Sequence, residues 1–203
     1  MKYQTLYLIR HAESQMSGKY CGSSDVGLSD LGLEQAQKLG VYFRTIPVDV
    51  CWTSQLKRAR QTAEILKQER GMPILQYSDL GEIHFGEWEG HEFSYVQEQW
   101  PLTYNQWIQS PATVQIPQGE SFMDFSSRVK RLGKELERAP ETNLVVIGHG
   151  GSLALLLMFL LKKPEDQFWN WVMTPASITI LQKEEPRNAN DFEIVRFKDS
   201  SYL

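Results

Sequence analysis

Apolar and polar positions alternate in blocks along the chain, with short strand-like runs followed by longer stretches of helical spacing. The short runs are rich in apolar and β-forming residues and end at polar residues or glycine. Strands are predicted at residues 3–9, 48–53, 144–147, 177–182 and 192–197, and helices at 29–44, 56–69, 122–138 and 153–161. This alternation predicts an α/β fold, a three-layer α/β/α sandwich with a mostly parallel central sheet.

Two apolar segments indicate which elements are buried. Residues 144–147 are apolar without interruption, which favours a central parallel strand covered by helices on both faces. Residues 153–161 form the most apolar stretch, but it is far shorter than the roughly 20 residues needed to span a bilayer. It is therefore interpreted as a buried helix. The polar segment 183–190 is predicted to be a turn between the last two strands.

Residues 81–117 differ from the rest in composition. Aromatic side chains gather here, at Phe85, Trp88, Tyr95, Trp100, Tyr104 and Trp107. Pro101, Pro111 and Pro117 are expected to interrupt any regular helix. We interpret the segment as an insertion or lid over one end of the sheet, within a single domain that spans residues 1–203, because binding residues concentrate in such segments.

Charge and cysteine content limit the functions that this chain can have. The 203 residues include 21 Lys+Arg and 25 Asp+Glu, giving a net charge of −4. This balance argues against a general affinity for nucleic acid, so any anion site must be local. Cys21 and Cys51 cannot form a disulfide framework, and the cysteines and histidines lack zinc-site spacing. Without a long apolar run near the start, we expect neither a secretory signal nor membrane attachment, and a reducing cytoplasm as the location.

Two histidines occupy matching positions. His11 and His149 each follow the last apolar residue of a predicted strand by two positions. Ligands of open α/β sheets bind beyond the carboxyl ends of the strands, so both histidines are expected at the substrate site. Gly150 and Gly151 allow the backbone to approach a ligand closely at a helix N-terminus.

Arginines are predicted at the same edge of the sheet. Arg10 precedes His11, and Arg58 falls in the first turn of a predicted helix. A cation there is unfavourable beside the positive end of the helix dipole unless an anion is present, so Arg58 is a candidate anion ligand. Lys57 and Arg60 are interpreted as a solvated basic face.

A carboxyl group near this edge could serve as a general acid. Glu82, Glu87 and Glu89 lie among aromatic residues, and an apolar pocket raises a carboxyl pKa towards useful values. Glu13 is a fourth candidate. The chemistry of the residues does not choose among the four.

Four motifs together resemble the histidine phosphatase superfamily, in the branch with cofactor-dependent phosphoglycerate mutase. They occur in the family's order at residues 8–14, 54–63, 80–90 and 148–151. Within the superfamily the chain is most similar to the α-ribazole phosphatases of cobalamin assembly. The resemblance implies a phosphoglycerate mutase-like fold and a phosphatase, with hydrolysis of α-ribazole 5′-phosphate or another small phosphate monoester.

The resemblance also implies roles for individual residues. His11 would be the nucleophile, and Glu82 would protonate the leaving oxygen. Arg10, Arg58 and His149, with Gly150, would hold the phosphate. No metal or other cofactor is implied. The mechanism needs a neutral His11, and the adjacent positive charges lower the pKa of a histidine.

The chain departs from the family pattern at two positions. Ala12 replaces the usual glycine after the nucleophile, and Ser17 stands where the family typically has a phosphate-binding asparagine, in a slightly shortened loop. Ser17 is carried as a substrate-binding candidate because its hydroxyl can donate one hydrogen bond.

Other functions remain open from the sequence. A phosphoglycerate mutase would share the motifs, although the short insertion favours hydrolysis. A phosphatase of broad specificity for sugar phosphates and nucleotides is a further alternative. A non-catalytic module that binds phosphorylated ligands would keep the same fold. The sequence does not indicate an oligomeric state.

Overall fold

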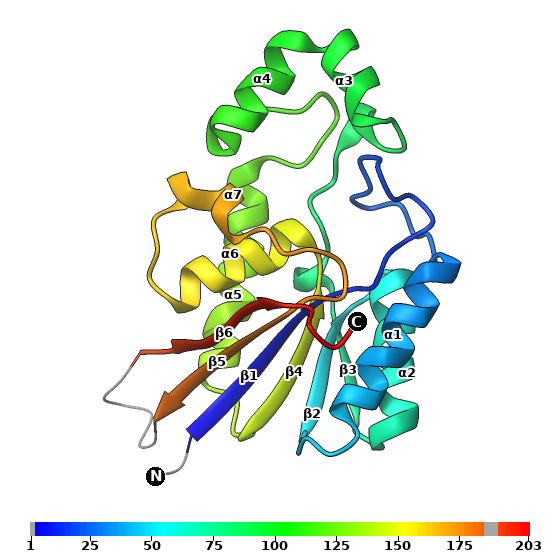
Figure 1. Ribbon diagram of the computed structural model, residues 1–203. Helices are drawn as coiled ribbons and strands as arrows, with labels where there is room; N and C mark the ends of the chain where they lie inside the picture. Colours follow the sequence, from blue (N-terminus) through cyan, green and yellow to red (C-terminus); the bar gives the residue numbers. More distant parts are fainter. Residues whose placement is uncertain (1–2, 185–190) are drawn as a thin grey trace.

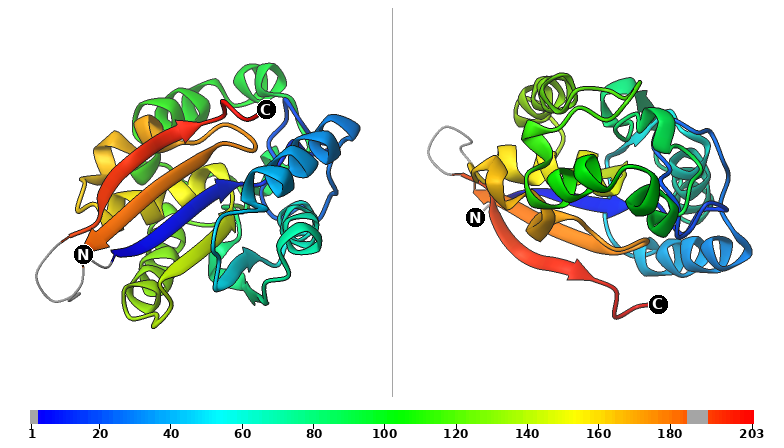
Figure 2. Two further views of the ribbon diagram at one scale, coloured as in Figure 1. Left: turned by 60° about the horizontal axis from the view of Figure 1, so that its bottom comes forward. Right: turned by 90° about the horizontal axis from the view of Figure 1, so that it is seen from above.

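The computed structural model describes residues 3–184 and 191–203, and their strands form a single twisted sheet (Figures 1 and 2). The strands are β1 (Tyr3–Arg10), β2 (Val50–Ser54), β3 (Ile74–Tyr77), β4 (Asn143–Gly148), β5 (Ile178–Glu184) and β6 (Glu193–Asp199). Their order is β3-β2-β4-β1-β5-β6. The first four in this order are parallel, whereas β5 and β6 run antiparallel to their neighbours.

Helices cover both faces of the sheet. They are α1 (Asp30–Phe43), α2 (Lys57–Arg70), α3 (Phe93–Gln99), α4 (Pro101–Gln109), α5 (Phe122–Glu137), α6 (Gly150–Leu160) and α7 (Phe168–Trp171). Leu6 and Leu8 of β1 pack with α5 and α6, whereas Tyr7 and Ile9 pack with α1 and α2. This alternation of side chains along one strand confirms the predicted three-layer α/β fold. No helix in the described ranges is both long and apolar enough to cross a membrane.

The predicted elements are present, with shifted boundaries. α6 begins at Gly150 rather than at residue 153, because His149 caps its N-terminus. β3 was not expected from the pattern, since this edge strand has two exposed residues among four. Of the predicted polar turn at residues 183–190, residues 183 and 184 belong to β5, and residues 185–190 lie outside the described part of the chain.

The aromatic segment lies beyond the carboxyl ends of the parallel strands and contains α3 and α4 (Figure 1). No helix of this segment runs through one of its prolines, as predicted: α3 ends at Gln99 before Pro101, and α4 ends at Gln109 before Pro111. Pro101 is the first residue of α4 and Pro111 begins a 3₁₀ turn. At a first helical position the missing N–H of proline has no partner to lose and its fixed φ suits the helix. Trp88 and Trp107 are buried and join the core on the α5 and α6 face.

Trp88 tests how much the packing of this segment contributes to stability. Its indole is fully buried and contacts the rings of Tyr20 and Trp107. Trp88→Ala is expected to lower the free energy of unfolding by about 3–5 kcal/mol, because it leaves a cavity in the core. Urea unfolding followed by circular dichroism measures this. Trp169→Ala, at a tryptophan that is 39% exposed, should lower the free energy of unfolding much less. Equal losses in the two variants would contradict the assignment of Trp88 to the core.

Candidate active site

A cavity of about 380 Å³ opens at the carboxyl ends of the parallel strands. The predicted site residues that line it are Arg10, His11, Ser17, Arg58, Glu82 and Gly150. The aromatic residues that line it are Tyr20, Phe85, Phe93, Tyr104, Trp107 and Trp169, with Phe168. His149 lies directly behind His11, with 4.9 Å between the ring centroids. The fold thus brings together residues that are far apart in the sequence, such as Arg10 and Trp169, which are separated by 159 positions.

His11 follows β1 and is held in one tautomer. Its Nδ1 lies 2.7 Å from the carbonyl oxygen of Ala12. Because a carbonyl only accepts, Nδ1 carries the proton and Nε2 keeps its lone pair. The Nε–H of Arg58 donates to that Nε2 at 3.2 Å. The side chain therefore presents a fixed, unprotonated nitrogen next to a guanidinium.

The surroundings of His11 keep it neutral. Burial lowers its pKa well below 6.5, and the positive charges of Arg10 and Arg58 lower it further, against a smaller opposing effect of the Ala12 hydrogen bond. The sequence prediction invoked the two arginines. The structure adds burial as the larger cause.

Arg58 is 1% exposed, so its charge must be compensated inside the protein. Its Nη1 donates to the carbonyl oxygen of Ser24 at 2.8 Å, and its Nη2 donates to those of Gly22 at 2.8 Å and Cys21 at 3.2 Å. These carbonyls stabilise the cation at the start of α2. The expectation that an anion is required for this purpose was therefore incomplete.

Glu89 holds the loop that supplies these carbonyls. Its carboxylate accepts hydrogen bonds from the backbone N–H groups of Gly22, Ser23 and Phe85 at 2.8–3.1 Å and from the Ser24 hydroxyl at 2.7 Å. Burial raises the pKa of Glu89, but these bonds outweigh burial and lower it overall. Among the candidate carboxyls, Glu89 is therefore a clamp between two loops.

The other candidate carboxyls occupy different positions. Glu82 reaches the cavity, where its Oε2 accepts from the backbone N–H of Gly151 at 2.8 Å and its Oε1 from that of Ile83 at 3.0 Å. Glu87 is exposed and is not part of the cavity lining. The structure therefore separates Glu82 from its neighbours, which the sequence chemistry left open.

Glu13 and Ser17 also line the cavity. The Ser17 hydroxyl donates to Glu13 Oε2 at 3.3 Å, and the Ser29 hydroxyl donates to Glu13 Oε1 at 2.8 Å. Glu13 thus ties the loop to the start of α1. A direct role of Ser17 in substrate binding stays a prediction.

His149 contributes from the end of β4. It is 1% exposed, and its Nε2 lies 2.8 Å from the hydroxyl oxygen of Ser54 at the end of β2. Burial lowers the pKa of His149 well below 6.5, and the positive charges of Arg58, Arg10 and Arg128 add to this. The sequence did not predict Ser54 as a partner of His149. The available signal was its position, because Ser54 directly follows a predicted strand, much as His11 and His149 follow theirs by two positions.

Arg10 ends β1 and is anchored on one side. Its Nη1 donates to the carbonyl oxygen of Met173 at 2.5 Å, while its buried Nε has no acceptor among the described residues. Burial lowers the pKa of Arg10, and the nearby carboxylate of Glu82 opposes this. The guanidinium remains charged at neutral pH. With Arg58 it forms a local positive centre in an otherwise acidic protein.

Comparison with known proteins identifies the family. The sequence model of the histidine phosphatase superfamily, branch 1, matches residues 6–199. The chain belongs to this superfamily. The resemblance that the four motifs indicated is thereby confirmed. Like the named members of its family, this chain is a phosphatase that uses a histidine nucleophile.

Individual relatives agree on the chemistry and differ in substrate. Adenosylcobalamin/alpha-ribazole phosphatase of Escherichia coli is 31% identical over 169 residues, 82% of this chain and 83% of the relative. Phosphoserine phosphatase 1 of Hydrogenobacter thermophilus is 31% identical over 186 residues, 90% of this chain and 88% of the relative. The solved alpha-ribazole phosphatase of Shigella flexneri has 28% identity and a TM-score of 0.84, covering 96% of each chain.

The two buried histidines predict how the stability of this phosphatase depends on pH. The unfolded chain binds protons at both near pH 6.5, whereas the folded chain does so only at lower pH. Unfolding therefore takes up protons below pH 6.5, and the free energy of unfolding falls there by about 1.4 kcal/mol per pH unit for each histidine. Urea unfolding at pH values from about 5 to 7.5 covers this window.

Substitutions show which histidine causes the pH dependence of the free energy of unfolding. His11→Asn and His149→Asn should each remove the contribution of one histidine. A slope that is insensitive to both buried substitutions would contradict the neutral state of these rings.

Proposed function

We propose that this histidine phosphatase hydrolyses small phosphate monoesters through a phosphohistidine formed on His11. The observation that carries the proposal is the fixed, unprotonated Nε2 of His11, which lies beside the Arg58 guanidinium on a histidine that lines the cavity. Arg10, Arg58, His149 and the backbone at Gly150 are proposed to hold the phosphoryl group, with Ser17 at the rim of the cavity. The guanidinium groups supply the positive charge, so the reaction needs no metal.

In the first step, His11 Nε2 attacks phosphorus and the P–O ester bond breaks. The electron pair of that bond goes to the leaving oxygen, which takes the proton of the Glu82 carboxyl. Arg10 and Arg58 neutralise the phosphoryl oxygens in the loose transition state. In the second step, water gives a proton to the Glu82 carboxylate and attacks phosphorus. The P–N bond breaks, its electron pair returns to Nε2, and inorganic phosphate leaves.

The aromatic lining favours a substrate whose leaving group contains a flat, uncharged ring. Phe93 and Trp169 are 47% and 39% exposed, so their faces are available to a ligand. Aromatic rings stack favourably on such surfaces. Together with the similarity to α-ribazole phosphatases, this supports α-ribazole 5′-phosphate as the substrate and α-ribazole as the product, a step of cobalamin biosynthesis.

One observation favours a second candidate substrate. Lys19 is exposed and lines the cavity, apart from the two arginines of the phosphate site. An ammonium there could pair with the carboxylate of phosphoserine, the substrate in the name of one relative. The two candidate substrates depend on different lining residues. α-Ribazole 5′-phosphate would use the rings of Phe93 and Trp169, whereas phosphoserine would use Lys19.

His11→Ala tests the mechanism. Loss of the nucleophile should reduce kcat/KM for phosphate esters by at least about a thousandfold and abolish an acid-labile, alkali-stable phosphoryl label on the protein. Rapid quenching with a ³²P-labelled ester measures the label. Glu82→Gln should still accept the label from 4-nitrophenyl phosphate, whose leaving group needs no proton. Turnover with labelling in His11→Ala would rule the mechanism out, and phosphate binding without any turnover would indicate a non-catalytic module.

A substrate panel tests the leaving group. We expect kcat/KM for α-ribazole 5′-phosphate to exceed that for phosphoserine, sugar phosphates, nucleotides and phosphotyrosine by at least about tenfold, a difference of about 1.4 kcal/mol. Trp169→Ala should reduce this preference, and Lys19→Ala should leave it intact. A preference for phosphoserine that Lys19→Ala abolishes and Trp169→Ala leaves intact would favour phosphoserine as the substrate. Isomerisation of 3-phosphoglycerate without phosphate release would indicate a mutase.

A further inference from the structure

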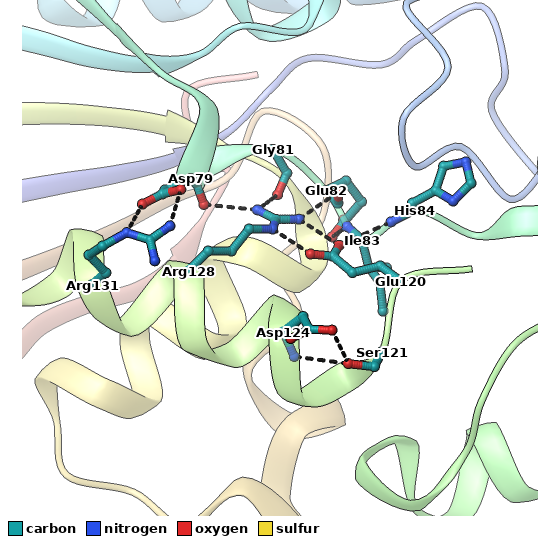
Figure 3. Close-up of polar contacts among 10 residues, drawn as sticks. All are labelled: Asp79, Gly81, Glu82, Ile83, His84, Glu120, Ser121, Asp124, Arg128 and Arg131. Carbon is teal, nitrogen blue, oxygen red and sulfur yellow. Dashed lines mark hydrogen bonds and ion pairs between the residues drawn. The ribbon is translucent and has the colours of Figure 1, made fainter. Parts of the chain in front are cut away.

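Arg128 of α5 lies beneath the segment that carries Glu82 and is not among the residues that line the cavity (Figure 3). Its Nη1 donates to the carbonyl oxygens of Asp79 at 3.0 Å and Gly81 at 2.8 Å, and its Nη2 donates to that of Glu82 at 3.0 Å. Its Nε and Nη2 also donate to the two carboxylate oxygens of Glu120 at 2.7 and 2.9 Å. One side chain thus binds three backbone carbonyls that lead to Glu82.

This arrangement uses the full capacity of a guanidinium. Arginine has five N–H donors in one plane, and the five bonds of Arg128 occupy all of them. A lysine ammonium has three donors on a flexible stem and cannot reproduce this fork. Glu120 completes the arrangement, because its Oε2 also accepts from the backbone N–H of His84 at 3.3 Å. The backbone is therefore held on both sides of Glu82.

A second path connects Arg128 to the carboxyl group of Glu82. The guanidinium lies over the ring of Phe125, 4.7 Å from its centroid. A methyl group on Gly151 would lie 3.2 Å from that ring and 2.5 Å from Glu82 Oε1. Gly151 therefore fits closely between the ring and the carboxylate to which it donates its N–H. Arg128 fixes the main chain of Glu82, while Phe125 supports the residue that fixes its carboxylate.

We propose that Arg128, together with Glu120, is a positioning residue that aims the carboxyl group of Glu82 at the leaving oxygen. The inference rests on the proposed role of Glu82 as the general acid. Loss of Arg128 then removes acid catalysis and spares nucleophilic attack and phosphate binding, because its bonds go to the Glu82 segment and not to Arg10, His11 or Arg58.

The leaving group distinguishes positioning from a general structural role. The kcat/KM value reports the steps up to phosphoryl transfer. An alkyl phosphate such as β-glycerol phosphate needs a proton on its leaving oxygen, whereas 4-nitrophenolate departs without one. Arg128→Ala should lower kcat/KM by about tenfold or more for the alkyl ester and by at most about twofold for 4-nitrophenyl phosphate. The inhibition constant of inorganic phosphate should stay within about twofold of its original value.

The chain offers a matched control and two milder variants. Arg131 lies on the same helix and binds the carboxylate of Asp79 at 2.8 and 2.9 Å, without a bond to the Glu82 carbonyl (Figure 3). Arg131→Ala should affect neither ester selectively. Arg128→Lys and Glu120→Gln should show the same selective loss to a smaller degree. They carry the test if Arg128→Ala fails to fold, which thermal unfolding reveals.

Glu82→Gln separates this inference from the proposed function. A selective loss on the alkyl ester in Glu82→Gln, with equal or absent losses in the Arg128 and Glu120 variants, would overturn the positioning role alone. Equal losses on both esters in Glu82→Gln would overturn the acid role of Glu82 and the inference with it. We expect a selective loss of kcat/KM for the alkyl ester in the Glu82, Arg128 and Glu120 variants, and no selective loss in Arg131→Ala.

Discussion

The buried guanidinium of Arg58 is the group on which the candidate site depends. Its charge is removed from water, and its Nε–H is used to contact His11, so its remaining donors need partners in the protein. Carbonyls within the loop of residues 21–24 accept from these donors. Glu89 in turn fixes this loop, because its carboxylate accepts from backbone N–H groups and the Ser24 hydroxyl of the loop. The geometry around His11 is therefore set by a carboxylate that does not line the cavity.

The parallel strands explain why these groups meet. β1, β2 and β4 are neighbours that point the same way, so the residues that follow them emerge at one edge. His11 and His149 lie at that edge because of strand register, and Ser54 bonds to His149 for the same reason. Bringing positive and titratable groups together in a dry site lowers the pKa of both histidines. The topology thus supplies the electrostatics as well as the positions.

The sequence predicted those parts of the site that depend on strand ends. His11, His149 and Arg10 follow from apolar runs and their last residues, because such runs end where a ligand binds. The choice of Glu82 could not be made from chemistry, since it depends on which backbone N–H groups lie near each carboxyl. The sequence predicted the interruption at Pro101 but not that Pro101 begins a new helix, because the position of a proline in a helix, rather than its residue type, decides its effect. The role of Arg128 needed the path of residues 79–82, which no pattern encodes.

In the proposed mechanism, phosphoryl transfer and substrate choice depend on different parts of this molecule. The phosphate side consists of buried groups on strand ends and long helices, where packing fixes them closely. The leaving-group side consists of partly exposed rings on short helices, such as Phe93 on α3 and Trp169 on α7. Changes in those rings would leave the buried charges intact, so we expect them to alter which ester is bound without altering how its phosphoryl group is transferred. Such a separation would allow relatives of near-equal identity to carry names with different substrates.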